Sequence, residues 1–260
     1  RAENAAGAVV VNYKEAVMRK GEVLLALARG GYMKRMPISD FKGQSRGGRG
    51  IKGMGVQSDD FIENLIYSST HDYLLFFTDK GKVYSKKAYE IPEYGRTAKG
   101  LPIVNLLQLE KGEKIQAVIN VPEDSKNQEL FFVTRLGTVK RTSVSEFQNI
   151  RTSGLIALTL RDGDQLSNVL PTDGHQTIII GTHQGYAVTF EETAVRSMGR
   201  TAAGVRGINL RPNDYVIGSG LLNSNEKVLV ISEHGYGKMT PADQYPVKGR
   251  GGKGIKTVNV

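Results

Sequence analysis

The chain has 260 residues with no cysteine and no tryptophan, and 35 lysines and arginines against 26 acidic residues give it a formal net charge of +9. The lack of cysteine excludes a disulfide framework and a thiolate zinc site, and no run approaches the ~18 apolar residues of a transmembrane helix. No signal-peptide pattern is present, and the positive charge suits a polyanionic partner or simply high solubility.

Residues 1–21 are predicted to form a separate N-terminal segment. Ala8–Tyr13 has the pattern of a strand, and Lys14–Arg19 is long enough for one helical turn. Neither stretch has a counterpart later in the chain.

From Glu22 onward the sequence repeats one pattern of short strands. Each repeat opens with a continuous apolar run, which is typical of a strand buried on both faces. A tight turn with a glycine follows, and the second strand carries lysines and arginines that we expect to be exposed, such as Lys34, Arg35, Lys140 and Arg141. The apolar runs are Leu24–Leu27, Leu74–Phe77, Leu130–Val133, Ile178–Ile180 and Val228–Ile231. The turn glycines are Gly31, Gly81, Gly137, Gly185 and Gly235.

A loop rich in arginine and glycine follows the second strand of each repeat. The loops close on Gly50, Gly100, Gly154, Gly204 and Gly254, so successive copies are 50, 54, 50 and 50 residues apart. A third strand begins after each closing glycine, and a fourth apolar stretch completes the first four repeats at residues 61–66, 115–121, 166–170 and 216–222.

Four short strands in each repeat predict a β-propeller, because one such unit cannot bury its apolar faces alone. We therefore expect an all-β, propeller-like ring of five four-stranded blades in a single domain, residues 22–260. The expected repeats are 22–71, 72–127, 128–175, 176–225 and 226–260. The fifth repeat lacks a fourth strand, which either the strand near Val9–Val11 or further chain would supply.

The strongest copy of the loop is Gln44-Ser45-Arg46-Gly47-Gly48-Arg49-Gly50. Arginine presents a planar fork that matches phosphate oxygens two at a time, and glycine lets a partner approach the backbone. An isolated loop of this kind is equally compatible with an ordinary surface turn and with a binding site. Its recurrence in every repeat favours the binding of a polyanion.

The recurring loops predict a basic surface, which a closed ring of repeats would place along one rim. Few aromatic residues lie among these basic residues in the sequence, and this disfavours stacking on the bases of single strands. The candidate residues besides Gln44–Gly50 are Lys42, Lys52, Arg96, Lys99, Arg151, Arg200, Arg206, Arg250, Lys253 and Lys256.

No catalytic residue and no metal site is assigned. Gly48–Gly53 fits a dinucleotide-binding pattern, but a strand rather than a helix is expected after it. His183 and His234 fall in hairpin turns and are expected to be solvated. Asp59-Asp60 and Glu191-Glu192 are likewise expected on solvated faces.

The repeats resemble the C-terminal domain of the A subunit of bacterial DNA gyrase, and Gln44–Gly50 resembles the signature of that family, the gyrase-A box. The resemblance runs from Glu22 to Val260 and includes the segments Tyr94–Gly100 and Gly199–Gly204. The second box position is usually basic in the family and is Ser45 here, which removes one potential phosphate contact. The related domain of topoisomerase IV has a degenerate box, so the intact Arg46–Gly50 favours gyrase.

This resemblance implies a β-pinwheel, which has six blades in the family, whose neighbouring blades exchange strands. It implies a domain that binds and wraps duplex DNA, so that an ATP-dependent type II topoisomerase introduces negative supercoils. In the family the catalytic tyrosine lies upstream, and ATP and magnesium are used elsewhere, so no cofactor is expected in this domain. The implied partners are duplex DNA, the breakage-reunion part of the gyrase A subunit and the gyrase B subunit, in the bacterial cytoplasm and without a membrane.

Three alternatives remain open. The first alternative is the corresponding domain of topoisomerase IV. The second is a propeller that serves as a scaffold for acidic proteins, and it predicts an apolar patch on one face of the ring. Binding of RNA through loops rich in arginine and glycine is disfavoured, because such segments are usually long and disordered.

Overall fold

The computed structural model describes residues 2–3, 9–10, 20–28, 30–38, 62–95, 97–125, 127–232 and 234–258. These residues form strands joined by turns and short 3-10 helices, and no α-helix is found among them, which confirms the all-β class. The chain divides into two compact units. Unit 1 comprises residues 1–75, 85–109 and 120–124, and unit 2 comprises residues 76–84, 110–119 and 125–260.

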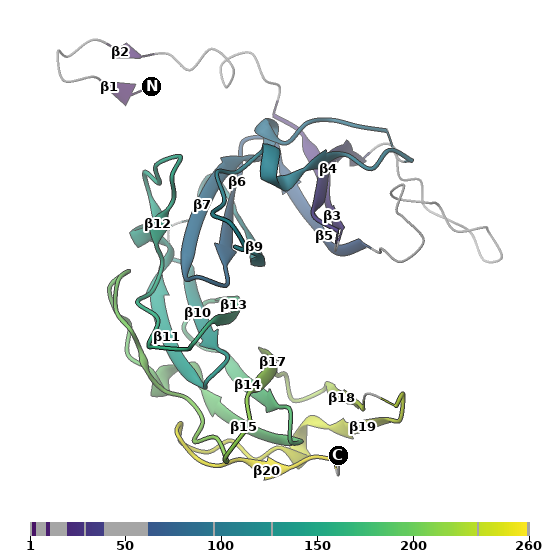
Figure 1. Ribbon diagram of the computed structural model, residues 1–260, viewed down its shortest axis with the longest axis vertical. Coiled ribbons are helices and arrows are strands. Elements are labelled where there is room, and N and C mark those ends of the chain that lie inside the picture. The colour runs from purple at the N-terminus through teal and green to yellow at the C-terminus, as the bar shows by residue number, and fades with distance from the viewer. Residues whose placement is uncertain are drawn as a thin grey trace. The chain divides into compact units, whose positions relative to one another are not determined.

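Four sheets share one strand order, in which a hairpin occupies the two central positions (Figure 1). The first sheet is β5 (Ile62–Ser69), β3 (Glu22–Ala28), β4 (Tyr32–Pro37) and β8 (Leu101–Pro102). The second is β9 (Ile115–Val121), β6 (Tyr73–Thr78), β7 (Lys82–Lys87) and β12 (Leu155–Ile156), and its residues belong to both units. The third is β13 (Leu166–Thr172), β10 (Glu129–Thr134), β11 (Thr138–Ser143) and β16 (Val205–Arg206). The fourth is β17 (Val216–Leu221), β14 (Thr177–Thr182), β15 (Tyr186–Glu191) and β20 (Ile255–Lys256).

Two smaller sheets complete the described strands. A fifth sheet pairs β18 (Lys227–Ile231) with β19 (Gly237–Pro241), and β1 (Ala2–Glu3) pairs with β2 (Val9–Val10). The strand expected near Val9 is thus present, whereas the helical turn expected at Lys14–Arg19 lies outside the described residues. The 3-10 helices are η2 (Ala88–Glu90), η3 (Ile103–Asn105), η4 (Val144–Phe147), η5 (Glu192–Ala194) and η6 (Ala242–Gln244).

The fourth strand of each four-stranded sheet comes from the next repeat. β8 pairs with β4, β12 with β7, β16 with β11 and β20 with β15, each over two residues. Every one of these strands follows the arginine- and glycine-rich loop of the repeat that donates it. The exchange of strands between neighbouring blades, expected from the resemblance, is therefore confirmed for these four sheets.

Strand exchange explains why the loops close on glycine. Gly204 has φ = 92°, and a Cβ atom there would lie 2.3 Å from the carbonyl oxygen of Val139 in β11. Gly100 has the same φ, and its Cβ atom would lie 2.4 Å from the carbonyl oxygen of Met33 in β4. Only glycine combines this left-handed backbone with such a close approach. The spacing of the closing glycines thus marks where each loop crosses the preceding sheet.

The core of unit 2 lies between the third and fourth sheets. Phe131 of β10 packs near Phe190 of β15, with ring centroids 6.0 Å apart, and both side chains are fully buried. Val139, Ile178, Ile180 and Ile208 belong to the same cluster. The apolar runs Leu74–Phe77 and Leu130–Val133 are fully buried, as their composition predicts.

The fifth sheet differs from the expected four-stranded blade. Within the described residues β18 pairs only with β19. Leu229 and Ile231 of β18 are 58% and 61% exposed, so the prediction that this run is buried on both faces is wrong. No strand flanks this hairpin in the described residues, and Leu229 and Ile231 line an open pocket with Ile179 and Ile217 of the fourth sheet, which leaves their side chains accessible.

Candidate nucleic-acid interface

The structure describes only part of the predicted site. Gln44–Gly50, Lys42, Lys52 and Arg96 lie outside the described residues. The remaining candidates are exposed, except for the half-buried Arg200. They are Lys99 in unit 1 and Arg151, Arg200, Arg206, Arg250, Lys253 and Lys256 in unit 2.

The loops of successive repeats in unit 2 lie side by side. The amide of Thr159 donates to the carbonyl of Ala202 at 3.4 Å, which joins the segment after β12 to the next loop. One repeat further along, the amide of Asn209 donates to the carbonyl of Gly252 at 2.8 Å. We call residues 151–161, 199–211 and 250–256 the loop strip. It brings together all the unit 2 candidates, whereas Lys99 belongs to unit 1.

Two of the predicted arginines also brace the strip. Arg200 donates through Nη1 to the carbonyl of Ile156 in β12. Arg250 donates to the carbonyls of Ala194 and Arg206, both at 3.1 Å. Each side chain therefore ties its loop to the strand donated by the loop before it, and most of its N–H donors are left for a phosphate.

Arginines outside the predicted set also join neighbouring loops. Arg161 donates to the hydroxyl of Thr138 at 2.8 Å and to the carbonyl of Gly204 at 3.1 Å. Arg211, one repeat later, donates to the carbonyl of Lys253 at 2.6 Å. The sequence signal for this pair is the recurrence of Leu-Arg 50 residues apart, at 160–161 and 210–211.

Tyrosine rings lie beneath several cations, contrary to the expectation that aromatic residues are scarce among them. The guanidinium of Arg211 lies 3.4 Å from the ring centroid of Tyr186, and the ammonium of Lys256 lies 5.2 Å from the same ring. Lys99 lies 5.7 Å from Tyr32 in unit 1. Tyr186 and Tyr32 are the first residues of β15 and β4, so these rings are distant in sequence from the cations over them. Cation–π contacts of this kind limit the movement of the charged groups.

A further cation stacks on Tyr215. The guanidinium of Arg135 lies 4.1 Å from the centroid of this ring, and the ring of His183 lies parallel to it with a centroid separation of 4.7 Å. His183 is exposed, in keeping with the expected solvated turn residue.

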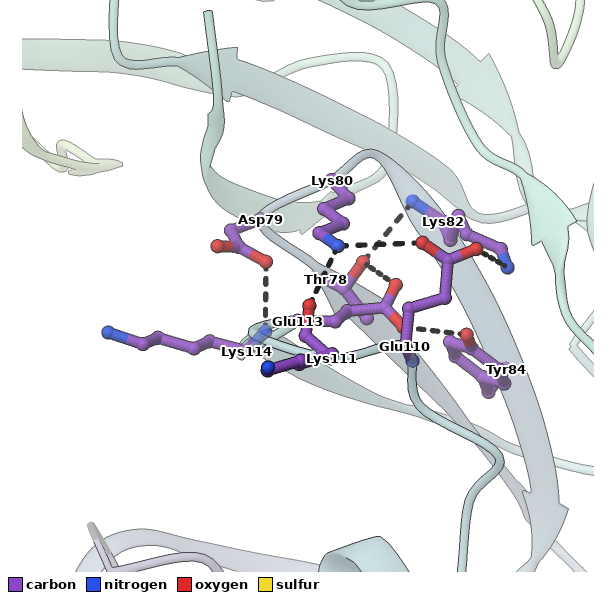
Figure 2. A network of polar contacts seen from close by, with 9 residues as sticks. All are labelled: Thr78, Asp79, Lys80, Lys82, Tyr84, Glu110, Lys111, Glu113 and Lys114. Atoms are coloured by element: carbon purple, nitrogen blue, oxygen red, sulfur yellow. Dashed lines mark hydrogen bonds and ion pairs between the residues drawn. The ribbon is translucent and has the colours of Figure 1, made fainter.

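In the second sheet, Glu110 partly neutralises the positive charge of Lys80 and Lys82 at the turn between β6 and β7 (Figure 2). Glu110 accepts from Lys82 at 3.2 Å and from Lys80 at 3.5 Å, and the hydrogen bond from Lys82 lowers the pKa of Glu110. Glu113 is buried and accepts from the hydroxyls of Thr78 and Tyr84, both at 2.7 Å. Burial and this hydrogen bond raise the pKa of Tyr84. We therefore expect weaker attraction for phosphate here than along the loop strip.

Lys140 and Lys34 of the second strands are buried, not exposed as predicted, whereas Lys238 of β19 is exposed and Lys86 and Lys87 of β7 are half-buried. Lys140 has no exposed surface and donates to the carbonyls of Ala157, at 2.5 Å, and Arg200. Lys34 has none either and donates to the carbonyls of Gly95 at 2.7 Å and Ala98 at 2.9 Å. Burial and the charge of Arg200 lower the pKa of Lys140 to about 7, and burial lowers the pKa of Lys34. The prediction of exposed lysines is wrong at these two positions because loops of the next repeat cover them.

Of the neighbouring arginines Arg35 is buried and Arg141 is largely buried, and Glu192 is fully buried. Arg35 donates to the carbonyl of Ile91, and Arg141 donates to the carbonyl of Val195, both at 2.9 Å. Glu192 is fully buried and accepts from Thr172 at 2.9 Å, with Arg141 3.5 Å away. The prediction that Glu192 lies on a solvated face is therefore wrong. These groups support the sheets and are not part of a surface site.

The described residues offer little for other chemistry. No group of three or more histidine, cysteine or acidic side chains among them is arranged to hold a metal ion. None of the described helices is long and apolar enough to cross a membrane. Among the described residues, the loop strip is therefore the feature that requires a functional explanation.

Comparison with known sequences agrees with this architecture. A family model described as "DNA gyrase C-terminal domain, beta-propeller" matches residues 22–69, 72–122, 128–173, 176–223 and 226–260. The DNA gyrase A subunit of Staphylococcus epidermidis is 44% identical over 249 residues, which cover 95% of this chain and 28% of that protein. Its counterpart in Staphylococcus aureus is 43% identical with the same coverage, so the chain spans about 28% of the length of these relatives.

Solved structures show the same fold. The C-terminal domain of DNA topoisomerase IV superposes with a TM-score of 0.80 and 28% identity, covering 92% of this chain and 73% of that one. A DNA gyrase A C-terminal domain gives a TM-score of 0.69 and 26% identity, covering 90% and 76% respectively. With its strand-exchanged sheets, its recurring loops and a family match over most of its length, this chain belongs to the DNA gyrase C-terminal domain, beta-propeller family.

Proposed function

We propose that this domain binds duplex DNA and wraps it within an ATP-dependent type II topoisomerase, so that the enzyme introduces negative supercoils. The observation that carries the proposal is the loop strip, which aligns Arg200, Arg206, Arg250, Lys253 and Lys256 on adjacent loops. These residues belong to different repeats, so the strip presents cations at intervals along a continuous surface.

Wrapping requires many such contacts. DNA has a persistence length of ~150 bp, and turning ~40 bp through half a circle costs on the order of 10 kcal/mol. Phosphate contacts spread along the arc can supply this free energy, because each releases condensed counterions. Specificity then comes from the shape and bendability of the duplex, with little reading of base edges.

The proposed partners within the enzyme are the breakage-reunion part of the gyrase A subunit and the gyrase B subunit. The support is the similarity to the A subunit, of which this chain spans about 28%. ATP and magnesium are proposed to act elsewhere in that assembly, in the bacterial cytoplasm, and this domain itself carries no catalytic residue.

The test is to ligate nicked circular DNA with the domain bound and then measure the change in linking number. A wrapping domain shifts the linking number in proportion to the amount bound. Binding without a shift would contradict wrapping. Competition by single-stranded DNA or an acidic polymer that equals competition by duplex DNA would contradict duplex recognition.

The corresponding domain of topoisomerase IV is the second candidate, because the TM-score to that domain is 0.80 against 0.69 for the gyrase domain. The intact Gln44–Gly50 heptapeptide and the 43–44% identity to gyrase A subunits favour gyrase. In the complete enzyme, negative supercoiling supports gyrase, whereas decatenation without supercoiling supports topoisomerase IV.

The scaffold alternative finds less support. Exposed apolar side chains do gather on the fifth sheet, at Leu229, Ile231 and Met239. However, Leu229 and Ile231 line a pocket together with Ile179 and Ile217 of the fourth sheet, so these two side chains face a neighbouring sheet of the same chain. The apolar patch therefore does not indicate a protein partner.

A further inference from the structure

Lys140 lies in a cage of backbone carbonyls directly beneath the loop that carries Arg200. Its ammonium group donates to Ala157 at 2.5 Å, to Arg200, and to Gly199 at 3.4 Å. The acceptors come from two different loops, so one buried side chain of β11 ties both loops to the third sheet.

Other donors hold three further carbonyls of this loop. The hydroxyl of Thr159 donates to the carbonyl of Thr201 at 2.7 Å, and the amide of Thr159 donates to Ala202 at 3.4 Å. Arg161 donates to Gly204 at 3.1 Å. Because carbonyl oxygens carry partial negative charge, their engagement with the protein removes a repulsion that a phosphate would otherwise meet.

The same device recurs in unit 1. Lys34 donates to the carbonyls of Gly95 and Ala98, and the amide of Ala98 closes a turn on Gly95 at 3.2 Å. The amide of Ala202 closes the equivalent turn on Gly199, also at 3.2 Å. The two loops share the sequence Gly-Arg-Thr-Ala, at residues 95–98 and 199–202.

The lysine accompanies this loop sequence and is not a requirement of the fold. The equivalent position of the second strand, three residues after the turn glycine, is Tyr84 in the second sheet and Val188 in the fourth, whereas the lysine at this position of the fifth hairpin, Lys238, is exposed. The loops over those two residues have other sequences, residues 151–154 and 250–253. Burying an ammonium group costs free energy, whereas Val188 fills the same place in the core at no such cost.

We propose that Lys140 and Lys34 are positioning residues for DNA binding: Lys140 holds the carbonyls of Gly199 and Arg200, and Lys34 holds those of Gly95 and Ala98, so that Arg200 and Lys99 meet the phosphate backbone in a fixed conformation. This inference rests on the proposed function and adds a role for residues that do not touch DNA. Lys140 acts through Arg200, and Lys34 acts through the loop that bears Lys99.

The test is a double-mutant cycle in the full 260-residue chain, with Lys140→Met, Arg200→Ala and the double variant. Binding to a duplex of about 40 bp is measured by fluorescence anisotropy between roughly 50 and 200 mM salt. We expect Lys140→Met to weaken binding about fivefold and to reduce the salt slope by about 1, the loss expected for one phosphate contact. The double variant should bind about as tightly as Arg200→Ala alone, because the two residues act as a unit.

Val188→Ala is the matched control, since it destabilises the equivalent position without removing a hydrogen-bond donor to the carbonyls of the loop above it. It should lower the melting temperature and leave DNA affinity unchanged. Should Lys140→Met fail to fold, Thr159→Val removes only the donor to the carbonyl of Thr201 at an exposed position. This variant should weaken binding in the same non-additive way with Arg200→Ala.

The outcomes separate the two proposals. If the wild-type chain does not bind duplex DNA, the proposed function fails and this inference fails with it. If the wild type binds and Lys140→Met retains its affinity and salt slope, only the positioning role is overturned. Fully additive effects of Lys140→Met and Arg200→Ala overturn it as well.

Discussion

At the scale of single residues, Lys140 couples the stability of the third sheet to pH. Its pKa is lowered from 10.5 to about 7 by burial and by the charge of Arg200. Between these two values the unfolded chain binds the proton that the folded chain has lost, so the free energy of unfolding rises with pH.

We predict that the difference in unfolding free energy between the wild type and Lys140→Met increases from about pH 7 to about pH 10.5, the window between the folded and unfolded pKa values. Its slope should approach, and not exceed, about 1.4 kcal/mol per pH unit. Urea unfolding of both proteins across this range measures the difference, and the subtraction removes the titration of groups common to both. Parallel stability curves would show that Lys140 keeps its ordinary pKa in the fold.

The burial of Lys140 and Lys34 is the kind of property that a sequence does not reveal. A lysine on a strand is usually exposed, because an isolated buried ammonium group is costly. What reverses this here is a loop from the next repeat, whose carbonyls replace water around the ammonium group. Only the recurrence of Gly-Arg-Thr-Ala in the loops over both lysines was available as a signal.

At the scale of elements, the closing glycines decide whether a strand can be donated to the preceding sheet. Gly204 needs both a positive φ and the space of a missing Cβ atom, because the carbonyl of Val139 lies 2.3 Å from where that atom would be. Gly163 has φ = 74° with nothing within 4 Å of its Cβ position, so it requires the backbone conformation alone.

We predict that Gly204→Ala lowers the free energy of unfolding by at least about 3 kcal/mol, and Gly163→Ala by about 1 kcal/mol. The two variants share the cost of an alanine at positive φ, so the difference between them reports the clash with β11. Urea unfolding of both chains gives the two values. Equal losses would mean that the donated strand shifts freely and that its position is not fixed by the glycine.

The strands themselves were largely predictable, but the sheet that each one joins was not. The fourth apolar stretch predicted at residues 115–121 matches β9 (Ile115–Val121), because a long apolar run with a turn on either side is a strong local signal. β16 contains only two residues and no pattern of its own. Its pairing with β11 depends on the packing of two repeats, and only the resemblance to a known family predicted the exchange.

At the scale of the whole molecule, the proposed function is electrostatic and therefore depends on salt. We predict that duplex affinity falls with a slope of log K against log salt of roughly −5 to −9, which corresponds to about six to ten engaged phosphates. Titrations of one duplex at several salt concentrations measure this slope. A value near −1 would mean that the net charge of +9 serves solubility and not binding.

The spacing of the closing glycines predicted the number of repeats, but it did not predict how many strands each sheet contains. The five repeats each contribute a described hairpin, and the fifth of these has no flanking strand among the described residues. A propeller repeat takes its strands from its neighbours, so the sequence of one repeat does not determine the strands of its own sheet.

The heptapeptide Gln44–Gly50 lies outside the described residues, and its role stays a prediction that distinguishes binding from wrapping. Replacing Arg46 and Arg49 by alanine removes two of many phosphate contacts, so the salt slope should fall by only about 2 and affinity for short linear duplex should fall modestly. Wrapping is different, because bent DNA stays on the domain only if contacts hold it along the whole arc, including its end. If this loop anchors that end, its loss lets the DNA leave the domain tangentially.

We therefore predict that the double variant binds DNA but no longer shifts the linking number of ligated nicked circles. In the complete enzyme, negative supercoiling should disappear while ATP-dependent relaxation or decatenation persists. Arg151→Ala or Arg200→Ala, in the weaker copies of the loop, is the control and should lower affinity without abolishing the shift. A double variant that shifts linking number like the wild type would show that Gln44–Gly50 is an ordinary turn. The wrap would then be anchored by the loop strip alone.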